Sequence, residues 1–282
     1  MCSPGCLGSS ERLSMQAITS RTNPKIKEVR ALRQRKMRQA SGLFVIEGIR
    51  PVGEALEAGF TFESLYVAPQ RLKGAFGLGL VEQAEQRGIP VYSLTDEVFN
   101  TLAEKDNPQG LLAVAQRAEQ RLEDLGIANF SWGVALVNPQ DPGNIGTILR
   151  TIDAVGASGL ILLDESADPY HPTAVRASMG TLFWHPVVQV GFAEFSGWAA
   201  QQGYTLYGTS AHASQDYRSL EAYQSPRLLL LGSERLGLTA EQASICHALL
   251  RLPMHGRATS LNLAVAAGVL LYDMLEKSQA YK

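Results

Sequence analysis

The chain has 282 residues, of which 45% are hydrophobic and 18% are charged, with 25 Lys and Arg against 27 Asp and Glu. This composition is that of an ordinary globular protein, long enough for two domains, and no apolar run approaches the ~20 residues of a membrane-spanning helix. Three cysteines, Cys2, Cys6 and Cys246, form no disulfide framework, so the sequence predicts a reducing, cytoplasmic setting.

The net charge of −2 hides an uneven distribution. Residues 1–40 carry nine basic and two acidic side chains, a net of +7, which leaves −9 for the rest of the chain. Residues 1–14, rich in Ser, Gly and Pro, are predicted to be a disordered tail. Asn23 before Pro24 then predicts the start of a helix. An apolar stripe at helical spacing continues this helix through Ile26, Val29, Leu32 and Met37.

Basic side chains cover the other faces of this predicted helix, with almost no acid between them. Such repulsion is normally relieved by opposite charges at i,i+4, which are largely missing here. A binding surface for an anionic partner such as RNA and a plain solvated face are equally good interpretations of this feature alone. The basic residues are Lys25, Lys27, Arg30, Arg33, Arg35, Lys36 and Arg38.

Strands and helices alternate after the basic helix. Strands are predicted at 43–47, 65–68, 90–93 and 110–115, and helices at 48–59, at 80–87 and directly after Thr95. The glycine-rich stretch 74–80 has the wrong spacing for a dinucleotide-binding turn and is interpreted as a loop. Residues 15–116 are therefore predicted to form a small α/β domain, and the polar residues 117–131 a linker.

Residues 132–282 repeat the alternation with longer apolar runs. Strands are predicted at 134–137, 160–163, 187–190, 205–207, 228–231 and 249–252, and a terminal helix at 261–279. Apolar strands separated by helices indicate a mostly parallel sheet with helices on both faces. P-loop and serine-hydrolase motifs are absent, and the histidines have no metal-ligand spacing, so no metal site is predicted.

Three polar segments, 138–150, 231–238 and 252–262, each follow a predicted strand. Taken singly, each is explained by an ordinary turn or helix cap, with Thr259 or Ser260 as the cap of the terminal helix. Ligands of open α/β sheets bind outside the carboxyl ends of the parallel strands. Because all three segments lie at such ends, together they predict one site.

The three segments resemble the three motifs of the SpoU (TrmH-type) RNA ribose 2′-O-methyltransferases of the SPOUT superfamily. Residues 176–183 are similar to the family's connection between the first two motifs, and residues 42–48 and 107–110 are similar to its small substrate-binding domain. The resemblance implies that residues 132–282 form a methyltransferase domain with a deep trefoil knot. It also implies that S-adenosylmethionine is the cofactor.

Motif positions carry the family's functional residues onto this chain. The resemblance implies catalytic roles for Asn144, Arg150, Glu234, Ser260 and Asn262. It implies cofactor contacts, chiefly through the backbone, at Thr209, Gly232, Leu252, Met254 and Leu261. Arg176 joins the RNA-binding set, and Arg235 departs from the family by replacing a glycine that usually follows the Glu.

The expected reaction is methyl transfer to a ribose 2′-hydroxyl of structured RNA, without a metal. Because a guanidinium is a poor base, we expect Arg150 to hold a phosphate and stabilise the developing alkoxide, with Asn144 orienting the hydroxyl. The family also implies a homodimer formed through the C-terminal domain, and ribosomal RNA is favoured over transfer RNA. Alternatives are a transfer RNA methyltransferase, a non-catalytic RNA-binding factor and a nucleotide-binding oxidoreductase. The sequence lacks the G-x-G-x-x-G turn that such an oxidoreductase would use to bind its dinucleotide.

Overall fold

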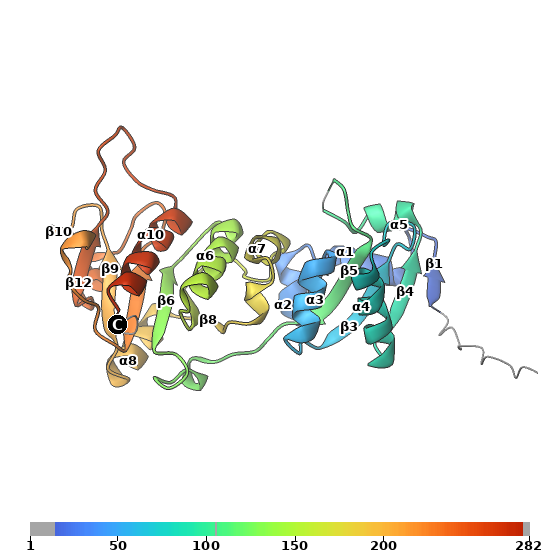
Figure 1. Ribbon diagram of the computed structural model, residues 1–282, viewed down its shortest axis with the longest axis horizontal. Coiled ribbons are helices and arrows are strands. Elements are labelled where there is room, and N and C mark those ends of the chain that lie inside the picture. Colours follow the sequence, from blue (N-terminus) through green and yellow to red (C-terminus); the bar gives the residue numbers. More distant parts are fainter. Residues whose placement is uncertain (1–14, 105, 279–282) are drawn as a thin grey trace, which may run out of the picture.

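The computed structural model describes residues 15–104 and 106–278, which form two lobes side by side (Figure 1). One lobe contains a five-stranded sheet with the order β1-β4-β3-β5-β2, and the other a seven-stranded sheet with the order β10-β12-β9-β11-β6-β7-β8. The tail predicted at 1–14 lies outside the described residues. No helix of the described ranges is long and apolar enough to cross a membrane.

The first lobe mixes parallel and antiparallel pairs. β5 is antiparallel to both β2 and β3, whereas β4 is parallel to β3 and β1. Its strands are β1 (Gln16–Ile18), β2 (Leu43–Glu47), β3 (Phe62–Val67), β4 (Val91–Leu94) and β5 (Leu111–Gln116). Its helices are α1 (Pro24–Ala31), α2 (Arg35–Ser41), α3 (Ile49–Glu57), α4 (Ala75–Gln86) and α5 (Asp96–Asn100). The four predicted strands are confirmed, and β1 is an addition that the sequence did not predict.

Two sequence predictions in this lobe are wrong. The stretch 74–80 is not a loop, because α4 begins at Ala75 with Gly74 as its N-cap. The basic helix is not continuous: it starts as predicted, with the Asn23 side chain accepting from the Lys25 backbone N–H, but stops at Ala31 and restarts at Arg35. The Arg38 guanidinium accounts for the break, since it donates to the carbonyl oxygens of Leu32 and Arg33 at 2.7 and 2.8 Å.

In the second lobe, every pair of neighbouring strands is parallel, which confirms the mostly parallel sheet. Its strands are β6 (Trp132–Val137), β7 (Gly159–Leu163), β8 (Val187–Val190), β9 (Thr205–Thr209), β10 (Gln215–Asp216), β11 (Arg227–Leu231) and β12 (Ala248–Arg251). Its α-helices are α6 (Pro142–Val155), α7 (Pro172–Ser178), α8 (Phe192–Gln201), α9 (Ala240–Ser244) and α10 (Leu263–Glu276). Short 3₁₀ turns occupy η1 (Leu122–Asp124), η2 (Thr181–Phe183) and η3 (Tyr217–Ser219). The trefoil knot stays a prediction.

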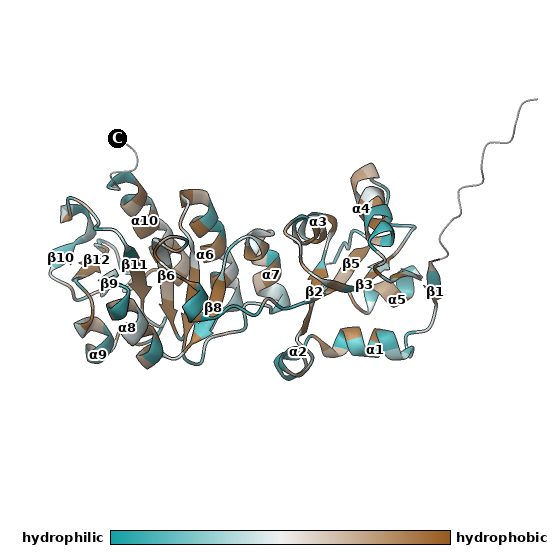
Figure 2. Cartoon of the chain, turned by 90° about the horizontal axis from the view of Figure 1, so that it is seen from below, coloured by the Kyte–Doolittle hydropathy of each residue, from teal (hydrophilic) through white to brown (hydrophobic). Residues whose placement is uncertain are grey.

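Hydrophobic residues concentrate on the strands of both sheets (Figure 2), and one apolar cluster runs from one lobe into the other. At the junction, the Phe44 ring of β2 lies 4.6 Å from the ring of Tyr170, centroid to centroid. Phe60 meets Phe183 of η2 edge to face at 5.1 Å. Burial of these aromatic rings favours one packed arrangement of the lobes over free movement about residues 117–131.

Candidate active site

The three polar segments meet at one edge of the second sheet. Strands β12, β9, β11 and β6 are parallel neighbours, so their carboxyl ends lie along the same edge. After β6, Asp141 caps α6 by accepting from the Gly143 N–H at 2.8 Å, and Pro142 occupies the first helical position. This turn places Asn144 in the first turn of α6, where it is 7% exposed.

A chain of hydrogen bonds links the three segments. The Asn144 side-chain amide donates to Glu234 Oε1 at 3.3 Å, and its carbonyl oxygen accepts from Asn262 Nδ2 at 2.9 Å. Glu234 also accepts from the backbone N–H of Gln140 at 3.3 Å. One buried amide therefore holds residues 118 positions apart in contact, and we name the trio Glu234, Asn144 and Asn262 the amide network.

Asn262 has a second role that the sequence assigned to other residues. Its Oδ1 accepts from the backbone N–H groups of Ala264 and Val265 at 2.9 and 3.3 Å, so Asn262 is the N-cap of α10. The prediction of Thr259 or Ser260 as that cap is wrong. The network thus shares a residue with the helix start, which fixes α10 against α6.

Gly232 follows β11 at a place where no side chain fits. A Cβ there would lie 2.1 Å from the backbone carbon of Gly237 and 2.4 Å from the Leu238 nitrogen. The cause is a tight turn in which Ser233 and Gly237 exchange backbone hydrogen bonds at 3.2 and 2.9 Å. Arg235, the departure from the family pattern, sits exposed on this turn. Gly232 is itself buried, so the protein's own turn requires a glycine at the end of β11.

The residues expected to contact the cofactor follow the next two strands along the sheet from Gly232, β9 and β12. Thr209 ends β9, Leu252 follows β12 directly, and both are half-buried, as is Met254. Half-buried apolar side chains such as Leu252 and Met254 at the edge of the sheet match the apolar faces of an adenine ring. These residues therefore fit S-adenosylmethionine. Leu261 is 40% exposed and lies at the α10 end of the loop that joins β12 to α10.

Arg150 and Ser260 are exposed and lie outside the amide network. Within the described ranges, neither side chain has a hydrogen-bond or ion-pair partner in the protein. Arg150 is six residues beyond Asn144 on α6, and Ser260 lies on the loop 252–262, which extends away from the second lobe (Figure 1). Both polar groups, one on α6 and one on the loop before α10, are available to a substrate. No cluster of three or more His, Cys, Asp or Glu side chains suited to a metal occurs in the described residues.

The seven basic residues of the leading segment divide into two groups. Lys27, Arg35 and Lys36 are exposed, and Lys25 is exposed with its ammonium 4.9 Å from the Tyr92 ring centroid. Arg30 folds back onto backbone oxygens of Ile26 and Arg21. We name the exposed residues Lys25, Lys27, Arg35 and Lys36 the basic face; their charges are accessible to the phosphates of an RNA.

Arg38 is the clear exception to the predicted RNA-binding set. Its side chain is 1% exposed, and its Nε donates to Asp168 Oδ2 at 2.7 Å in the other lobe. A buried guanidinium with three internal acceptors cannot touch RNA in this structure, so the prediction for Arg38 is wrong. The physical reason is the partner 130 residues away, which no local pattern shows.

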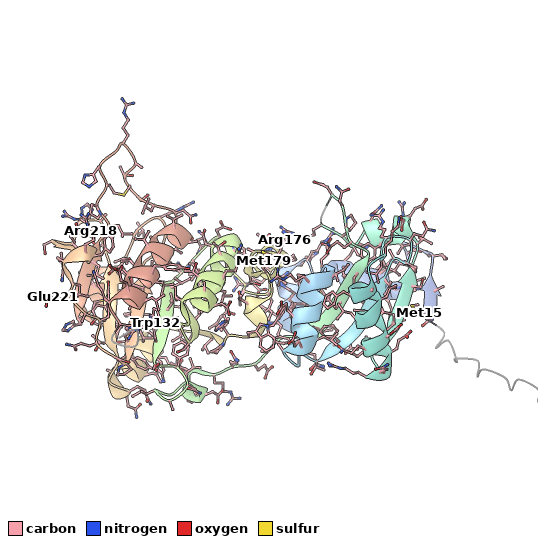
Figure 3. The ribbon with its side chains drawn as sticks, viewed as in Figure 1. Met15, Trp132, Arg176, Met179, Arg218 and Glu221 are labelled. Atoms are coloured by element: carbon pink, nitrogen blue, oxygen red, sulfur yellow. The ribbon has the colours of Figure 1, made fainter. Side chains whose placement is uncertain are left out.

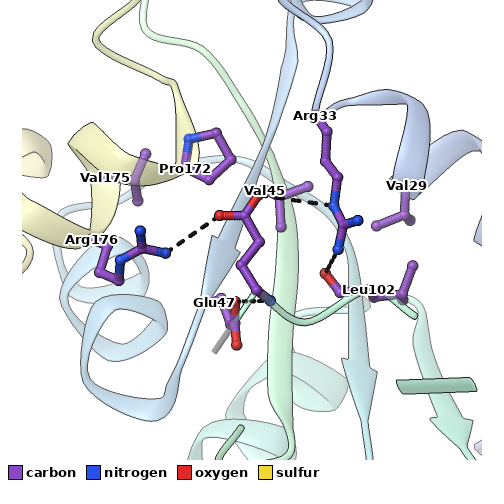
Figure 4. Close-up of a pocket in the computed structure, with 9 residues that line it drawn as sticks. Val29, Arg33, Val45, Glu47, Leu102, Pro172, Val175 and Arg176 are labelled. Atoms are coloured by element: carbon purple, nitrogen blue, oxygen red, sulfur yellow. Dashed lines mark hydrogen bonds and ion pairs between the residues drawn. The ribbon is translucent and has the colours of Figure 1, made fainter. Parts of the chain in front are cut away.

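Arg33 and Arg176 are also engaged within the protein, and Figure 3 shows Arg176 at the junction of the lobes. Both face Glu104, with N···O distances of 3.9 and 3.3 Å (Figure 4). Arg33 also donates to the carbonyl oxygens of Leu102 and Ala103 at 3.1 Å each. Their side chains remain about two-fifths exposed, at 43% and 44%. Asp168 and Glu104 are thus functional candidates that sequence reasoning missed, since nothing in the local sequence marks them.

Known proteins resemble the chain in both lobes. The family model described as the SpoU rRNA Methylase family matches residues 131–272, and the MRM3-like substrate binding domain matches residues 23–113. The 23S rRNA (uridine(2479)-2′-O)-methyltransferase of Streptomyces viridochromogenes is 33% identical, covering 92% of each chain. The 23S rRNA (guanosine(2553)-2′-O)-methyltransferase of Bacillus subtilis is 31% identical, covering 92% of this chain and 99% of its own.

Solved structures agree with this assignment. An AdoMet-bound rRNA methyltransferase from Sinorhizobium meliloti has a TM-score of 0.85 and 36% identity, over 93% of this chain and 97% of its own. The SpoU methyltransferase AviRb from Streptomyces viridochromogenes, in complex with AdoMet, has a TM-score of 0.79 and 30% identity, over 90% and 97%. With motifs, fold and relatives in accord over nearly its whole length, the chain belongs to the SpoU rRNA methylase family.

Proposed function

We propose that this protein transfers a methyl group from S-adenosylmethionine to a ribose 2′-hydroxyl of ribosomal RNA. The observation that carries the proposal is the amide network, because it brings the three motif segments together at the edge where we expect the cofactor to bind. Relatives matching nearly the whole chain are named as 23S rRNA 2′-O-methyltransferases, which favours ribosomal over transfer RNA. Such a substrate favours the cytoplasm as the place of action.

The amide network changes the role we assign to Asn144. One of its N–H groups donates to Glu234 and its oxygen accepts from Asn262, and the side chain is only 7% exposed, so its orientation is set by the protein and little of it is open to a hydroxyl. We assign it instead to holding the motif segments at a fixed separation. Glu234 then buttresses the turn after β6 through the Gln140 N–H, which keeps the start of α6 in place.

Arg150 and Ser260 are the groups left to act on the RNA. When bound, S-adenosylmethionine supplies an electrophilic methyl group on a sulfonium. Arg150 has no partner among the described side chains, so its guanidinium can grip a phosphate beside the target ribose and stabilise the charge that develops on O2′. Ser260, exposed on the loop before α10, can relay the hydroxyl proton to solvent, since its own hydroxyl donates as it accepts. Holding the hydroxyl in line with the methyl group provides the rest of the acceleration.

The basic face supplies affinity for RNA that does not depend on sequence. Lys27, Arg35 and Lys36 point into solvent on the lobe that matches a substrate-binding domain. Contacts of this kind release counterions, so binding weakens steeply as salt is added.

A homodimer formed through the second lobe is the finer part of the proposal. On α10, Val265 and Tyr272 are 52% and 55% exposed, although the helix is apolar along most of its length. Tyr272 lines a hollow together with Tyr217 and Val269. An exposed apolar helix face of this kind is typical of a subunit contact.

Arg150 variants test the proposal most simply. Purified protein, ribosomal RNA and radiolabelled S-adenosylmethionine should give 2′-O-methylnucleosides, identified by mass spectrometry of the digested RNA. Arg150→Ala should abolish transfer and leave calorimetric binding of S-adenosylmethionine nearly intact. A collapse of cofactor binding in that variant would refute the assigned role, and methylation of a base or of transfer RNA alone would refute the proposed reaction.

A further inference from the structure

We propose that Arg38 is a positioning residue, which fixes the basic face relative to the methyltransferase lobe and so governs methyl transfer without touching RNA. The inference rests on the proposed function for its effect on turnover. Its structural part, a fixed geometry between α1 and the second lobe, stands independently of the reaction.

Arg38 joins three parts of the molecule through one guanidinium. Nη1 donates to the carbonyl oxygens of Leu32 and Arg33, which end α1 and have no helical partner there. Nε donates to Asp168 Oδ2 in the other lobe at 2.7 Å. The carboxyl end of α1 is therefore tied, through a single rigid planar group, to the segment that precedes α7.

Asp168 is anchored on its own side. Its second oxygen accepts from the Tyr170 N–H at 2.9 Å, and its backbone oxygen accepts from the His171 N–H at 3.0 Å. The Tyr170 ring in turn packs on Phe44 of β2. Both carboxylate oxygens are thus committed, and the pair has little freedom to rotate.

Burial makes this tie specific to one geometry. The side chains are 1% and 5% exposed, so water does not reach either partner in this arrangement of the lobes. A buried ion pair loses its stabilisation as soon as its partners separate, because each charge is then left without compensation. The exposed contacts of Glu104 with Arg33 and Arg176 are more tolerant, since solvent can take their place.

The position of α1 matters because RNA held on the basic face must deliver one ribose to the site in the other lobe. A displacement of about 1 Å from the reactive geometry can lower a rate by about 100-fold. Loss of the Arg38 contact should therefore reduce kcat, while the phosphate contacts and the cofactor pocket remain. That pattern differs from the loss of a direct RNA contact, which weakens RNA binding and its dependence on salt.

The test compares Arg38→Met with Asp168→Asn and with Arg35→Met, an exposed arginine of the same helix. Asp168→Asn keeps the shape and the acceptor for the Tyr170 N–H but removes the charge facing Arg38. For each variant we would measure kcat on ribosomal RNA, RNA affinity across a salt series, and S-adenosylmethionine affinity by calorimetry. Spin labels at Glu28 on α1 and Glu241 on α9, with Cys2, Cys6 and Cys246 changed to Ser, would report the distance between the lobes.

Arg38→Met should lower kcat by about 10-fold or more, with RNA and cofactor affinities within twofold of wild type. The distance distribution should widen or shift, and Asp168→Asn should change it in the same direction. Arg35→Met should weaken RNA binding and reduce the salt slope by about 0.7–0.9, with the distance distribution unchanged.

Two results would overturn the inference. An unchanged distance distribution in both Arg38→Met and Asp168→Asn would show that the pair does not hold the lobes, and a lower salt slope in Arg38→Met would make Arg38 a direct RNA contact. If Arg38→Met does not fold, Asp168→Asn alone provides the test. A wild-type kcat and a wild-type distance distribution in Asp168→Asn would then refute the inference. A wild-type protein without methyl transfer would refute the proposed function but not the distance measurement.

Discussion

The amide network predicts an unusual dependence on pH for the substitution Asn144→Asp. The variant keeps the size of the side chain and an oxygen that accepts from Asn262 Nδ2. It replaces the amide donor, 3.3 Å from Glu234 Oε1, with a carboxylate oxygen. At pH 8 a hydrogen bond therefore becomes a contact between two negative charges.

The cost follows from that distance. Two unit charges 3.3 Å apart repel by about 1 kcal/mol at the dielectric constant of water and by about 5 kcal/mol at a dielectric constant of 20. Glu234 is exposed, so the lower figure applies more closely. Loss of a hydrogen bond to a charged acceptor adds about 1.5–3 kcal/mol. We expect the free energy of unfolding to fall by about 3 kcal/mol at pH 8, or the melting temperature by roughly 6–12 °C.

Because the two carboxylates of the variant repel each other, the pair takes up a shared proton more readily as the pH falls toward 5.5, and that proton restores a hydrogen bond between them. The deficit relative to wild type should then shrink to about 1 kcal/mol. Urea unfolding of variant and wild type at both pH values measures the difference. Asn144→Ala is the control, because it removes both bonds and should show the same deficit at each pH. An equal deficit for Asn144→Asp at pH 8 and 5.5 would show that Asn144 and Glu234 are not in contact.

Three further predictions address other parts of the molecule. Gly232→Ala should weaken S-adenosylmethionine binding at least tenfold by calorimetry, since its Cβ would lie 2.1 Å from Gly237, whereas Gly191→Ala, which meets nothing within 4 Å, should bind normally. Burial, and after it the charge of Arg38, lowers the pKa of His171 in the folded protein. As the pH falls, the imidazole is therefore protonated in the unfolded chain before it is protonated in the folded one. The free energy of unfolding should decrease as the pH drops below about 6.5. His171→Asn keeps the α7 cap and should lose that part of the acid sensitivity in urea unfolding, while an unchanged pH profile would refute the effect. Tyr272→Asp should reduce the sedimentation mass from twice 30.5 kDa to 30.5 kDa, and a wild-type mass already at 30.5 kDa would remove the dimer.

Much of the second lobe was predictable because its information is local. The strands around Leu160–Leu163 and Leu228–Leu231 are short apolar runs, and each motif segment directly follows such a strand. A parallel sheet then brings the segments to one edge without further assumptions. The amide network itself was beyond the sequence, because hydrogen-bond partners such as Asn144 and Asn262 are fixed by the packing of α6 against α10.

The first lobe shows where local patterns fail. The stripe Ile26, Val29 and Leu32 is buried as expected, yet the helix breaks after Ala31 because Arg38 takes up the carbonyl oxygens that would continue it. A run of basic residues looks uniform in sequence, although burial turns one member into a contact between the lobes and leaves Arg35 and Lys36 in solvent. The strand β1 is three residues long and exists through its pairing with β4, a partner that no periodicity indicates.

Whether this protein methylates ribosomal RNA in the cell is decided by a map of ribose 2′-O-methylation across all ribosomal RNA. The map compares cells with the gene, cells without it, and cells without it that are supplied with the wild-type or the Arg150→Ala protein. We predict that one ribosomal position loses its 2′-O-methyl group without the gene, regains it with the wild-type protein, and stays unmethylated with Arg150→Ala. A map in which every ribosomal position keeps its methylation in the absence of the gene would contradict the account.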